Sequence, residues 1–259
     1  MIERRRILLM RHGAVEYFDT DGRPYPPDDV PLTDSGVAQA RGVGRALAGA
    51  GVSIDRAITS GLMRTRATAQ AVLDTAGLAP PLEHWPQFEE IRPGRLSAIP
   101  EQELRAAFIG AFEGPVPHET QFLGGETIGA LLDRVLPALQ RLLAASDWDT
   151  TLLVLHGGVN RALLSWFLTG QPVFLGGLAQ DPGCLNIVDV GPTPATSVLR
   201  VLNFCPLDPL QTGTRLSTME ELLHKYLTLR SRSALTPDPP DQVRGRLSPA
   251  DAGEGRKTS

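Results

Sequence analysis

The chain has 259 residues, 42% of them hydrophobic, and is therefore long enough to bury a substantial core in one large domain or two small ones. Its 25 lysines and arginines against 29 aspartates and glutamates give a net charge of −4, without the basic excess that is typical of nucleic-acid-binding proteins. After the charged start "MIERRR", the apolar run "ILLM" is too short for a signal peptide or a membrane span. We therefore expect a cytoplasmic protein that binds neither nucleic acid nor membrane. Cys184 and Cys205 lack the spacing of a metal site, and we expect both to be buried apolar residues.

Predicted strands and helices alternate along the chain. The apolar run 7–10 predicts a first strand, and a helix follows from the N-cap Thr33 to Gly51. A strand at 55–60 and a helix at 61–77 come next, and then a helix at 127–146 that contains Pro137. The remaining predicted elements are a strand at 150–158, a helix ending at Gly170, a strand pair at 184–190 and 197–204, and a helix beginning at Ser217. This alternation predicts an α/β fold with a mainly parallel sheet.

Two segments break the pattern. Residues 92–123 form an excursion over one face of the sheet, and excursions of this length are often lids or substrate-selecting loops. Residues 231–259 are rich in proline and charge and predict a disordered tail behind a catalytic domain at 1–230. Aromatic residues of the excursion and of the loop after Gly13 predict a rim that accepts a partly hydrophobic group: Tyr17, Phe18, Phe108, Phe112 and Phe122.

The chemically active side chains follow three predicted strands. Parallel sheets bind ligands at the carboxyl ends of their strands, and the first strand ends in Arg11 and His12. The second strand leads to Arg64, one turn into its helix, and the third leads to His156 and Gly157. Two arginines and two histidines at one edge of a sheet predict a phosphate site.

A histidine between arginines points to a nucleophile. Neighbouring positive charge disfavours imidazolium, so His12 keeps the lone pair with which it can attack phosphorus. Arg11, Arg64 and His156 would bind the phosphoryl oxygens, and Gly157 lets the backbone approach them. The leaving alkoxide needs a proton, for which "QFEEIRPG" offers Glu89 and Glu90; periodicity does not choose between the two.

These residues resemble motifs of the histidine phosphatase superfamily, also called phosphoglycerate-mutase-like. "RHG" at 11–13 resembles its defining motif, and similar segments follow in the family's order: "DVPLTDSGVAQA", "TSGLMRTRATA", "FEEIRPG", "GGET" and "VLHGGVNRALL". The resemblance implies a three-layer α/β/α sandwich, a phosphohistidine intermediate on His12 and no metal or other cofactor. It also implies Glu90 as the acid and Arg11, Arg64, His156 and Gly157 as phosphate-binding residues.

Departures from the family pattern favour a phosphatase that acts on a small phosphorylated metabolite. Ala14, Val15 and Phe18 stand where relatives carry polar pocket residues. The excursion also mixes acids with its arginines, whereas a mutase needs extra basic residues to hold a second phosphate. The alternatives are a phosphomutase of the same family and a non-catalytic module that binds a phosphorylated ligand.

Overall fold

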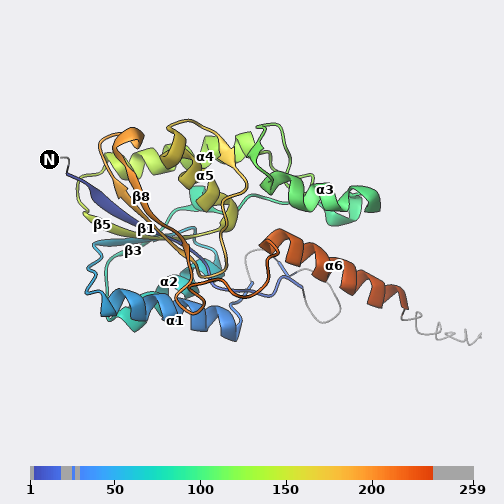
Figure 1. The fold of residues 1–259 in the computed structure, drawn as a ribbon, viewed down its shortest axis with the longest axis horizontal. Helices are drawn as coiled ribbons and strands as arrows, with labels where there is room; N and C mark the ends of the chain where they lie inside the picture. Colours follow the sequence, from blue (N-terminus) through green and yellow to red (C-terminus); the bar gives the residue numbers. More distant parts are fainter. Residues whose placement is uncertain (1–2, 19–24, 27–29, 236–259) are drawn as a thin grey trace, which may run out of the picture.

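The computed structural model of the protein describes residues 3–18, 25–26 and 30–235 (Figure 1). Within these residues one sheet has the strand order β3 (Leu82–His84), β2 (Arg56–Thr59), β5 (Thr150–Leu155), β1 (Arg5–Arg11), β7 (Leu185–Val190) and β8 (Val198–Phe204). The first four strands in this order are parallel, whereas β7 is antiparallel to both of its neighbours. The prediction of a mainly parallel sheet is confirmed. The sequence did not predict β3 or the antiparallel pairing of β7 with β1.

Strand β1 lies in the middle of the sheet and is buried on both faces. Its four apolar residues, Ile7 to Met10, are at most 1% exposed. Ile7 and Leu9 belong to the hydrophobic cluster on the α4 and α5 side, and Leu8 and Met10 to the cluster on the α1 and α2 side. An unbroken apolar run is what a central parallel strand with helices on both faces requires.

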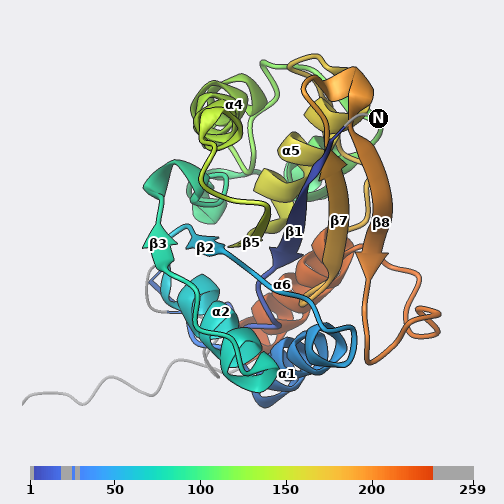
Figure 2. The ribbon, with the colours of Figure 1, turned by 90° about the vertical axis from the view of Figure 1, so that its left-hand side faces the viewer.

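Helices cover both faces of the sheet, so the fold has three layers (Figure 2). One face carries α1 (Asp34–Gly49) and α2 (Met63–Ala76), and the other carries α4 (Ile128–Ala144) and α5 (Gly157–Thr169). The predicted three-layer α/β/α sandwich is therefore confirmed. Within the described ranges, no helix combines the length and the apolar character needed to cross a membrane.

The helix ends follow the signals in the sequence. The Thr33 hydroxyl accepts a hydrogen bond from the Gly36 amide at the start of α1, and Thr127 caps α4 in the same way. Helices α2 and α5 end at Gly77 and Gly170, both in the left-handed conformation that favours glycine. Pro137 lies inside α4, which continues to Ala144.

The excursion folds into short elements beyond the carboxyl ends of the strands (Figure 1). They are the 3-10 helices η2 (Leu96–Ala98), η3 (Glu101–Glu103) and η4 (Gly110–Phe112), helix α3 (Leu104–Ile109), and strand β4 (Pro115–Val116), which pairs with β6 (Phe174–Leu175). Two further 3-10 helices, η1 (Pro86–Phe88) and η5 (Pro194–Thr196), lie outside the excursion.

The predicted aromatic rim is wrong for three of its members. Phe108 is fully buried, and Phe18 and Phe122 are 5% and 8% exposed. Phe112 packs edge-on against Phe122. Phe18 and Phe108 pack against Tyr226 of the C-terminal helix, and Phe122 packs against Phe112. These rings therefore belong to the hydrophobic packing under the excursion and do not form a solvent-exposed rim.

Helix α6 (Thr218–Leu235) lies beside α3 at the same end of the molecule (Figure 1). The helix start predicted at Ser217 is closed by a capping box: Ser217 Oγ accepts from the Glu220 amide at 3.3 Å, and Glu220 Oε2 accepts from the Ser217 amide at 2.7 Å. The helix includes residues 231–235, which the sequence assigned to the tail. Residues 236–259 of the predicted tail lie outside the described residues, and the division into a 1–230 domain and a tail stays a prediction.

Candidate active site

The structure brings the predicted basic residues together at the carboxyl edge of the sheet. Strands β1 and β5 are hydrogen-bonded neighbours, so His12 and His156 follow adjacent strand ends. Their ring centroids are 5.2 Å apart at an interplanar angle of 67°. Arg64 lies in the first turn of α2, directly after β2, which pairs with the other edge of β5. The parallel order β2-β5-β1 therefore determines where these side chains meet.

The cluster is buried as well as cationic. Arg11 and Arg64 are 6% and 5% exposed, and His12 and His156 are 1% and 0% exposed. Burial, followed by the charges of Arg11 and Arg64, holds the pKa of His12 well below its ordinary value of 6.5. Two buried guanidinium groups that both act on His12 form a site that an anion stabilises.

One hydrogen bond fixes the tautomer of neutral His12. Its Nδ1 lies 2.8 Å from the carbonyl oxygen of Gly13, and because a carbonyl can only accept, Nδ1 carries the proton. The other ring nitrogen, Nε2, then has the lone pair of a neutral imidazole. His12 is thus held in the tautomer that a nucleophile at Nε2 requires.

His156 is held by a chain of hydroxyl groups. Its Nε2 lies 2.8 Å from Ser60 Oγ, which lies 3.0 Å from Thr65 Oγ1, and Thr65 donates to the carbonyl of Leu62. Since the Thr65 proton is used there, Ser60 donates to Thr65 and His156 Nε2–H donates to Ser60. Burial and then the charge of Arg64 hold the pKa of His156 well below 6.5.

The guanidinium of Arg11 is anchored through Nη1. Its Nη1 donates to the Gln180 carbonyl at 2.5 Å and to Thr218 Oγ1 at 3.0 Å. Its buried Nε has no hydrogen-bond partner among the described residues. Arg161, a third buried arginine, lies nearby, and burial followed by the charge of Arg11 lowers its pKa to about 10. Arg161 therefore stays charged at neutral pH.

The two candidate acids occupy different environments. Both oxygens of Glu90 lie 3.1 Å from the amide of Gly158, at the amino end of α5, and Oε1 also accepts from the Ile91 amide. Glu89 instead forms an ion pair with Arg92 at 3.3 Å, and Arg92 is exposed. Gly158, which Glu90 contacts, is the second residue after His156 in the sequence, because α5 begins directly after that histidine.

Arg134 holds the loop that carries Glu90. Its guanidinium donates to the carbonyls of Gln87, Glu89 and Glu90 and to both carboxylate oxygens of Glu126. These hydrogen bonds connect the loop to α4. Arg134 thus positions the loop through its backbone carbonyls and does not bind the carboxyl group of Glu90.

Three glycines permit close approaches around the site. A Cβ atom on Gly13 would lie 2.4 Å from the Gly36 carbonyl oxygen, and one on Gly158 would lie 2.6 Å from Glu90 Oε1. Gly157 lies against two arginines, since a Cβ atom there would be 3.2 Å from Arg161 Nη1 and 3.5 Å from Arg11 Nε. Gly13 is therefore required by a backbone contact, whereas a Cβ atom on Gly158 would displace the Glu90 carboxylate.

Several site residues were missed by sequence reasoning from chemistry alone. Ser60, Gln180 and Thr218 contact the histidines or Arg11, yet a serine, a glutamine and a threonine carry no distinctive signal. Arg161 and Ser60 lie within the segments that resemble the family, and Thr218 directly follows the helix start predicted at Ser217.

Comparison with known proteins decides the family. A model of the histidine phosphatase superfamily (branch 1) matches residues 7–203, which include every candidate catalytic residue. The chain belongs to this superfamily. Residues 205–235, including α6, lie beyond the matched part.

Curated histidine phosphatase relatives include both hydrolases and mutases. The adenosylcobalamin/alpha-ribazole phosphatase of Salmonella typhimurium is 31% identical over 205 residues, which cover 76% of this chain and 96% of that protein. A 2,3-bisphosphoglycerate-dependent phosphoglycerate mutase of Azorhizobium caulinodans is 34% identical over 170 residues, covering 62% of this chain and 80% of the mutase. The alpha-ribazole phosphatase of Shigella flexneri has a similar structure, with a TM-score of 0.58, 26% identity and coverage of 76% of this chain and 96% of that one.

Proposed function

We propose that the protein is a metal-independent phosphatase that hydrolyses a small phosphorylated metabolite through a phosphohistidine on His12. The observation that carries the proposal is the buried, neutral His12, whose Nδ1–H is bound to the Gly13 carbonyl and whose neighbours are Arg11 and Arg64. This arrangement supports attack by Nε2 while fixed positive charge stabilises the phosphoryl oxygens.

In the first step, His12 Nε2 forms a bond to phosphorus and the bond from phosphorus to the substrate alcohol oxygen breaks. Glu90, in its protonated form, gives its proton to the departing oxygen. In the second step, water attacks phosphorus, its proton passes to Glu90, and the bond to Nε2 breaks. His12, protonated Glu90 and inorganic phosphate result.

The relatives support a small metabolite as the substrate, since their names specify alpha-ribazole phosphatase and phosphoglycerate mutase activities. A mutase is the second candidate, because the matched mutase is 34% identical to this chain. It would return the phosphoryl group from His12 to its product instead of passing it to water.

The test is release of inorganic phosphate from a panel of phosphorylated metabolites in the presence of EDTA. We expect release by the wild type and by His224→Ala, an exposed histidine on α6, and none by His12→Ala. Rapid quenching with labelled substrate should trap an acid-labile phosphoenzyme in the wild type alone. Release that persists in His12→Ala would contradict the mechanism, and stimulation by a bisphosphate without net phosphate release would favour the mutase.

A further inference from the structure

Helix α6 lies beyond the part of the chain that the family model matches, yet it contacts the segment that carries the candidate nucleophile. The model ends at residue 203, and α6 begins at Thr218. Three side chains of α6 contact three side chains of the segment 11–18: Thr218 contacts Arg11, Lys225 contacts Glu16, and Tyr226 contacts Phe18. The helix therefore extends the matched fold and reaches the candidate phosphate site.

The hydrogen bonds of Arg11 leave one edge of its guanidinium free. Nη1 carries two protons, which it donates to the Gln180 carbonyl at 2.5 Å and to Thr218 Oγ1 at 3.0 Å. The buried Nε has no hydrogen-bond partner among the described residues. Nε–H and one N–H of Nη2 point the same way and form the edge with which an arginine binds two oxygens of a phosphate. The two contacts of Nη1 thus leave the Nε–Nη2 edge for an anion.

This free edge faces the start of α5. A Cβ atom on Gly157 would lie 3.5 Å from Arg11 Nε and 3.6 Å from Arg11 Cζ. Gly157 directly follows His156 and begins α5, and the amino end of a helix favours anions. The free edge and the amino end of α5 therefore face the same place beside His156, which suits the phosphoryl group of a substrate.

Two acceptors are needed to hold the guanidinium in this orientation. Arg161 is a like charge nearby, since the charge of Arg11 is, after burial, the largest cause of its lowered pKa. A guanidinium that donates to one acceptor can still rotate about that hydrogen bond, whereas two acceptors on Nη1 fix its plane. One acceptor is the backbone carbonyl of Gln180, and the other is the side chain of Thr218. Loss of the Thr218 hydroxyl would therefore let the free edge turn away from the phosphate.

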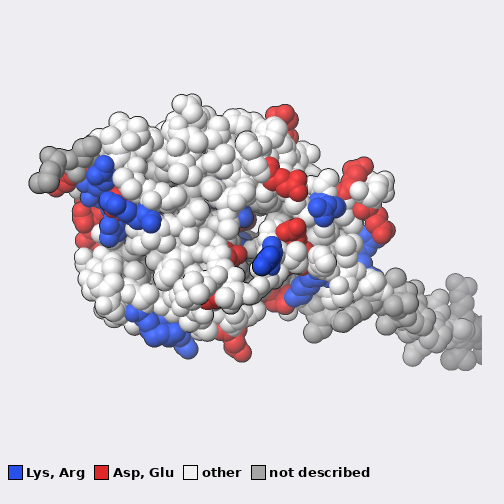
Figure 3. All heavy atoms as spheres, viewed as in Figure 1, with Lys and Arg blue, Asp and Glu red and all other residues white. Residues whose placement is uncertain are grey.

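Helix α6 is itself held by contacts outside the phosphate site. The capping box closes its start, and Tyr226 packs on Phe108 of α3 with ring centroids 5.8 Å apart. Arg230 of α6 also pairs with Glu101 of η3 at 3.9 Å. Figure 3 shows acidic and basic side chains close together at this end of the molecule. The start of α6 therefore has a fixed position from which Thr218 can orient the arginine.

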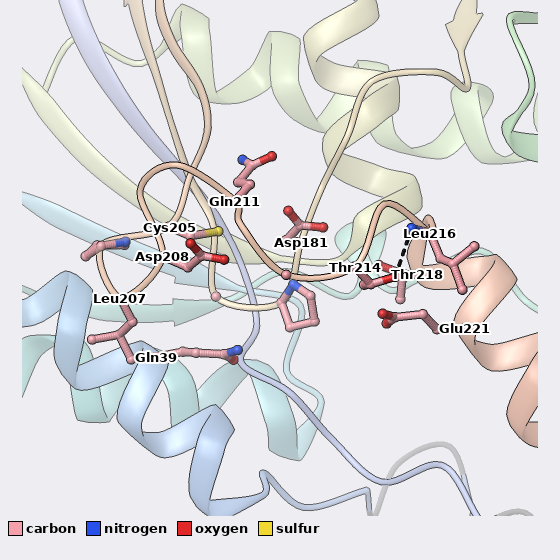
Figure 4. A pocket seen from close by; sticks show the side chains of 14 residues that line it. Gln39, Asp181, Cys205, Leu207, Asp208, Gln211, Thr214, Leu216, Thr218 and Glu221 are labelled. Carbon is pink, nitrogen blue, oxygen red and sulfur yellow. Dashed lines mark hydrogen bonds between the residues drawn. The ribbon is translucent and has the colours of Figure 1, made fainter.

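Thr218 also borders a pocket of about 240 Å³, which lies beneath the chain that leads from β8 to α6 (Figure 4). The pocket has room for water, so a water molecule can replace the hydroxyl when the side chain is shortened to alanine. Valine has the shape of threonine without its hydroxyl and therefore excludes water from that place. Thr218→Val is thus the variant that removes the acceptor from Nη1.

The same pocket explains the exposure of one cysteine. Cys184 is buried as predicted, whereas Cys205 lies on the pocket wall and is only partly buried, so the prediction is wrong for Cys205. Burial, followed by the charges of Asp181 and Asp208, raises the pKa of its thiol to about 11. The thiol therefore stays uncharged at neutral pH and adds no anion to the pocket beside Thr218.

We propose that Thr218 is a positioning residue of the phosphate site and that α6 is thereby a functional part of the enzyme. Its hydroxyl holds Nη1 so that the Nε–Nη2 edge of Arg11 binds two phosphoryl oxygens. The inference deepens the proposed phosphatase function and rests on it for the effect on catalysis. Binding of inorganic phosphate tests the same orientation without turnover.

Calorimetric titration of the whole chain with inorganic phosphate measures the orientation of Arg11. Thr218→Val should raise the Kd about tenfold, because a hydrogen bond that orients a charged group is lost. Thr218→Ser keeps the hydroxyl and should stay within about twofold of the wild type. Thr228→Val makes the same substitution at an exposed position of α6, where the hydroxyl donates to the His224 carbonyl, and should change nothing. Unchanged affinity in Thr218→Val, or an equal loss in Thr218→Ser, would overturn the proposal.

Kinetics separate the role of Thr218 from a contact with the leaving alcohol. Arg11 would hold the phosphoryl group that all substrates share, so Thr218→Val should lower kcat/KM about tenfold for an alkyl phosphate and for p-nitrophenyl phosphate alike. Thr218→Ser should again restore the value, and Thr228→Val should match the wild type. A loss confined to one of the two esters would show that Thr218 acts on the alcohol and not through Arg11.

A double-mutant cycle connects Thr218 to the arginine. Lysine has no Nη1, so adding Thr218→Val to Arg11→Lys should change the phosphate Kd by less than about twofold. A further loss of about tenfold in the double variant would mean that Thr218 does not act through Arg11. If the wild type binds phosphate in the expected pattern but releases none from any ester, the proposed phosphatase activity fails and the positioning role stands. If the wild type hydrolyses esters and Thr218→Val equals it in both measurements, only the positioning role fails.

Discussion

At the scale of single residues, two adjacent glutamates show how the local environment distinguishes a candidate site residue from a surface residue. Glu90 contacts the amino end of α5 through the Gly158 amide, whereas Glu89 pairs with the exposed Arg92. The Glu90 carboxylate therefore lies at the start of the helix that follows His156, which is consistent with the acid role proposed for it. The proposed acid role therefore makes a prediction that depends on the leaving group.

Replacing Glu90 with glutamine should slow the hydrolysis of alkyl phosphates by about 100-fold or more, because the alkoxide then leaves without a proton. Hydrolysis of p-nitrophenyl phosphate should be much less affected, since its leaving group is stable as an anion. The measurement is kcat for both substrates, with Glu89→Gln as the matched control. Equal losses on both substrates would indicate that Glu90 acts through structure and not as an acid.

The residue scale also shows what the sequence could identify. Arg11, His12, Arg64 and His156 could be named because strand ends and charge predict a phosphate site, and the structure places them together. Their catalytic roles stay predictions. The choice between Glu89 and Glu90 needed the family resemblance, because both are carboxylates on one loop. Thr218 could not be found, since a hydroxyl becomes significant only when folding brings it 3.0 Å from Arg11.

At the scale of elements, strand and helix prediction succeeded where local signals act. The apolar run of β1 and the caps of α1 and α4 are encoded by neighbouring residues. The antiparallel pairing of β7 with β1 was missed because pairing between segments more than 170 residues apart has no local signal. The three-residue edge strand β3 was missed because it is too short for a periodic pattern.

Helix α6 is attached to the site by aromatic and ionic contacts. Tyr226 packs 6.1 Å from Phe18 and 5.8 Å from Phe108, measured between ring centroids, and Lys225 forms an ion pair with Glu16. Phe18 is one of the positions at which the chain departs from the polar family pattern. The departure is explained here, since the apolar side chain meets a helix that lies beyond the family match.

Removing the Tyr226 ring should loosen α6 without unfolding the sandwich. Tyr226→Ala loses two aromatic pairs. Each pair contributes roughly 0.5–1.5 kcal/mol to stability, in addition to the contribution of the apolar area that it buries. We expect faster amide hydrogen exchange in residues 218–235 and unchanged protection in β1 and β5. Leu227→Ala on the same helix is the control, because Leu227 is 41% exposed. Unchanged exchange in Tyr226→Ala would show that other contacts hold the helix.

At the scale of the whole molecule, the two buried histidines couple stability to pH. The pKa values of His12 and His156 are lowered in the folded state, so below about pH 6.5 the unfolded chain binds protons that the folded protein does not. The free energy of unfolding should therefore fall as pH decreases through this range. The slope should approach about 1.4 kcal/mol per pH unit for each histidine.

Urea unfolding at about pH 7 and about pH 5.5 measures this effect. His156→Asn should roughly halve the pH dependence, and His224→Ala should leave it unchanged. The lowered pKa values of Asp55, Glu126 and Asp189 do not interfere, because stability from such carboxylates is lost only as pH falls below their ordinary values near 4. A pH dependence that survives unchanged in His156→Asn would contradict this account.

The position of β1 has a consequence for synthesis on the ribosome. The strand that ends at His12 is made before both of its neighbours, since Ile7 pairs with Thr151 and Val188, which are made more than 140 residues later. Until β5 has emerged, the nascent chain presents the apolar run Ile7 to Met10 with neither of its sheet partners. The centre of the sheet is thus completed late in translation, and during most of synthesis this run is a ready binding site for chaperones.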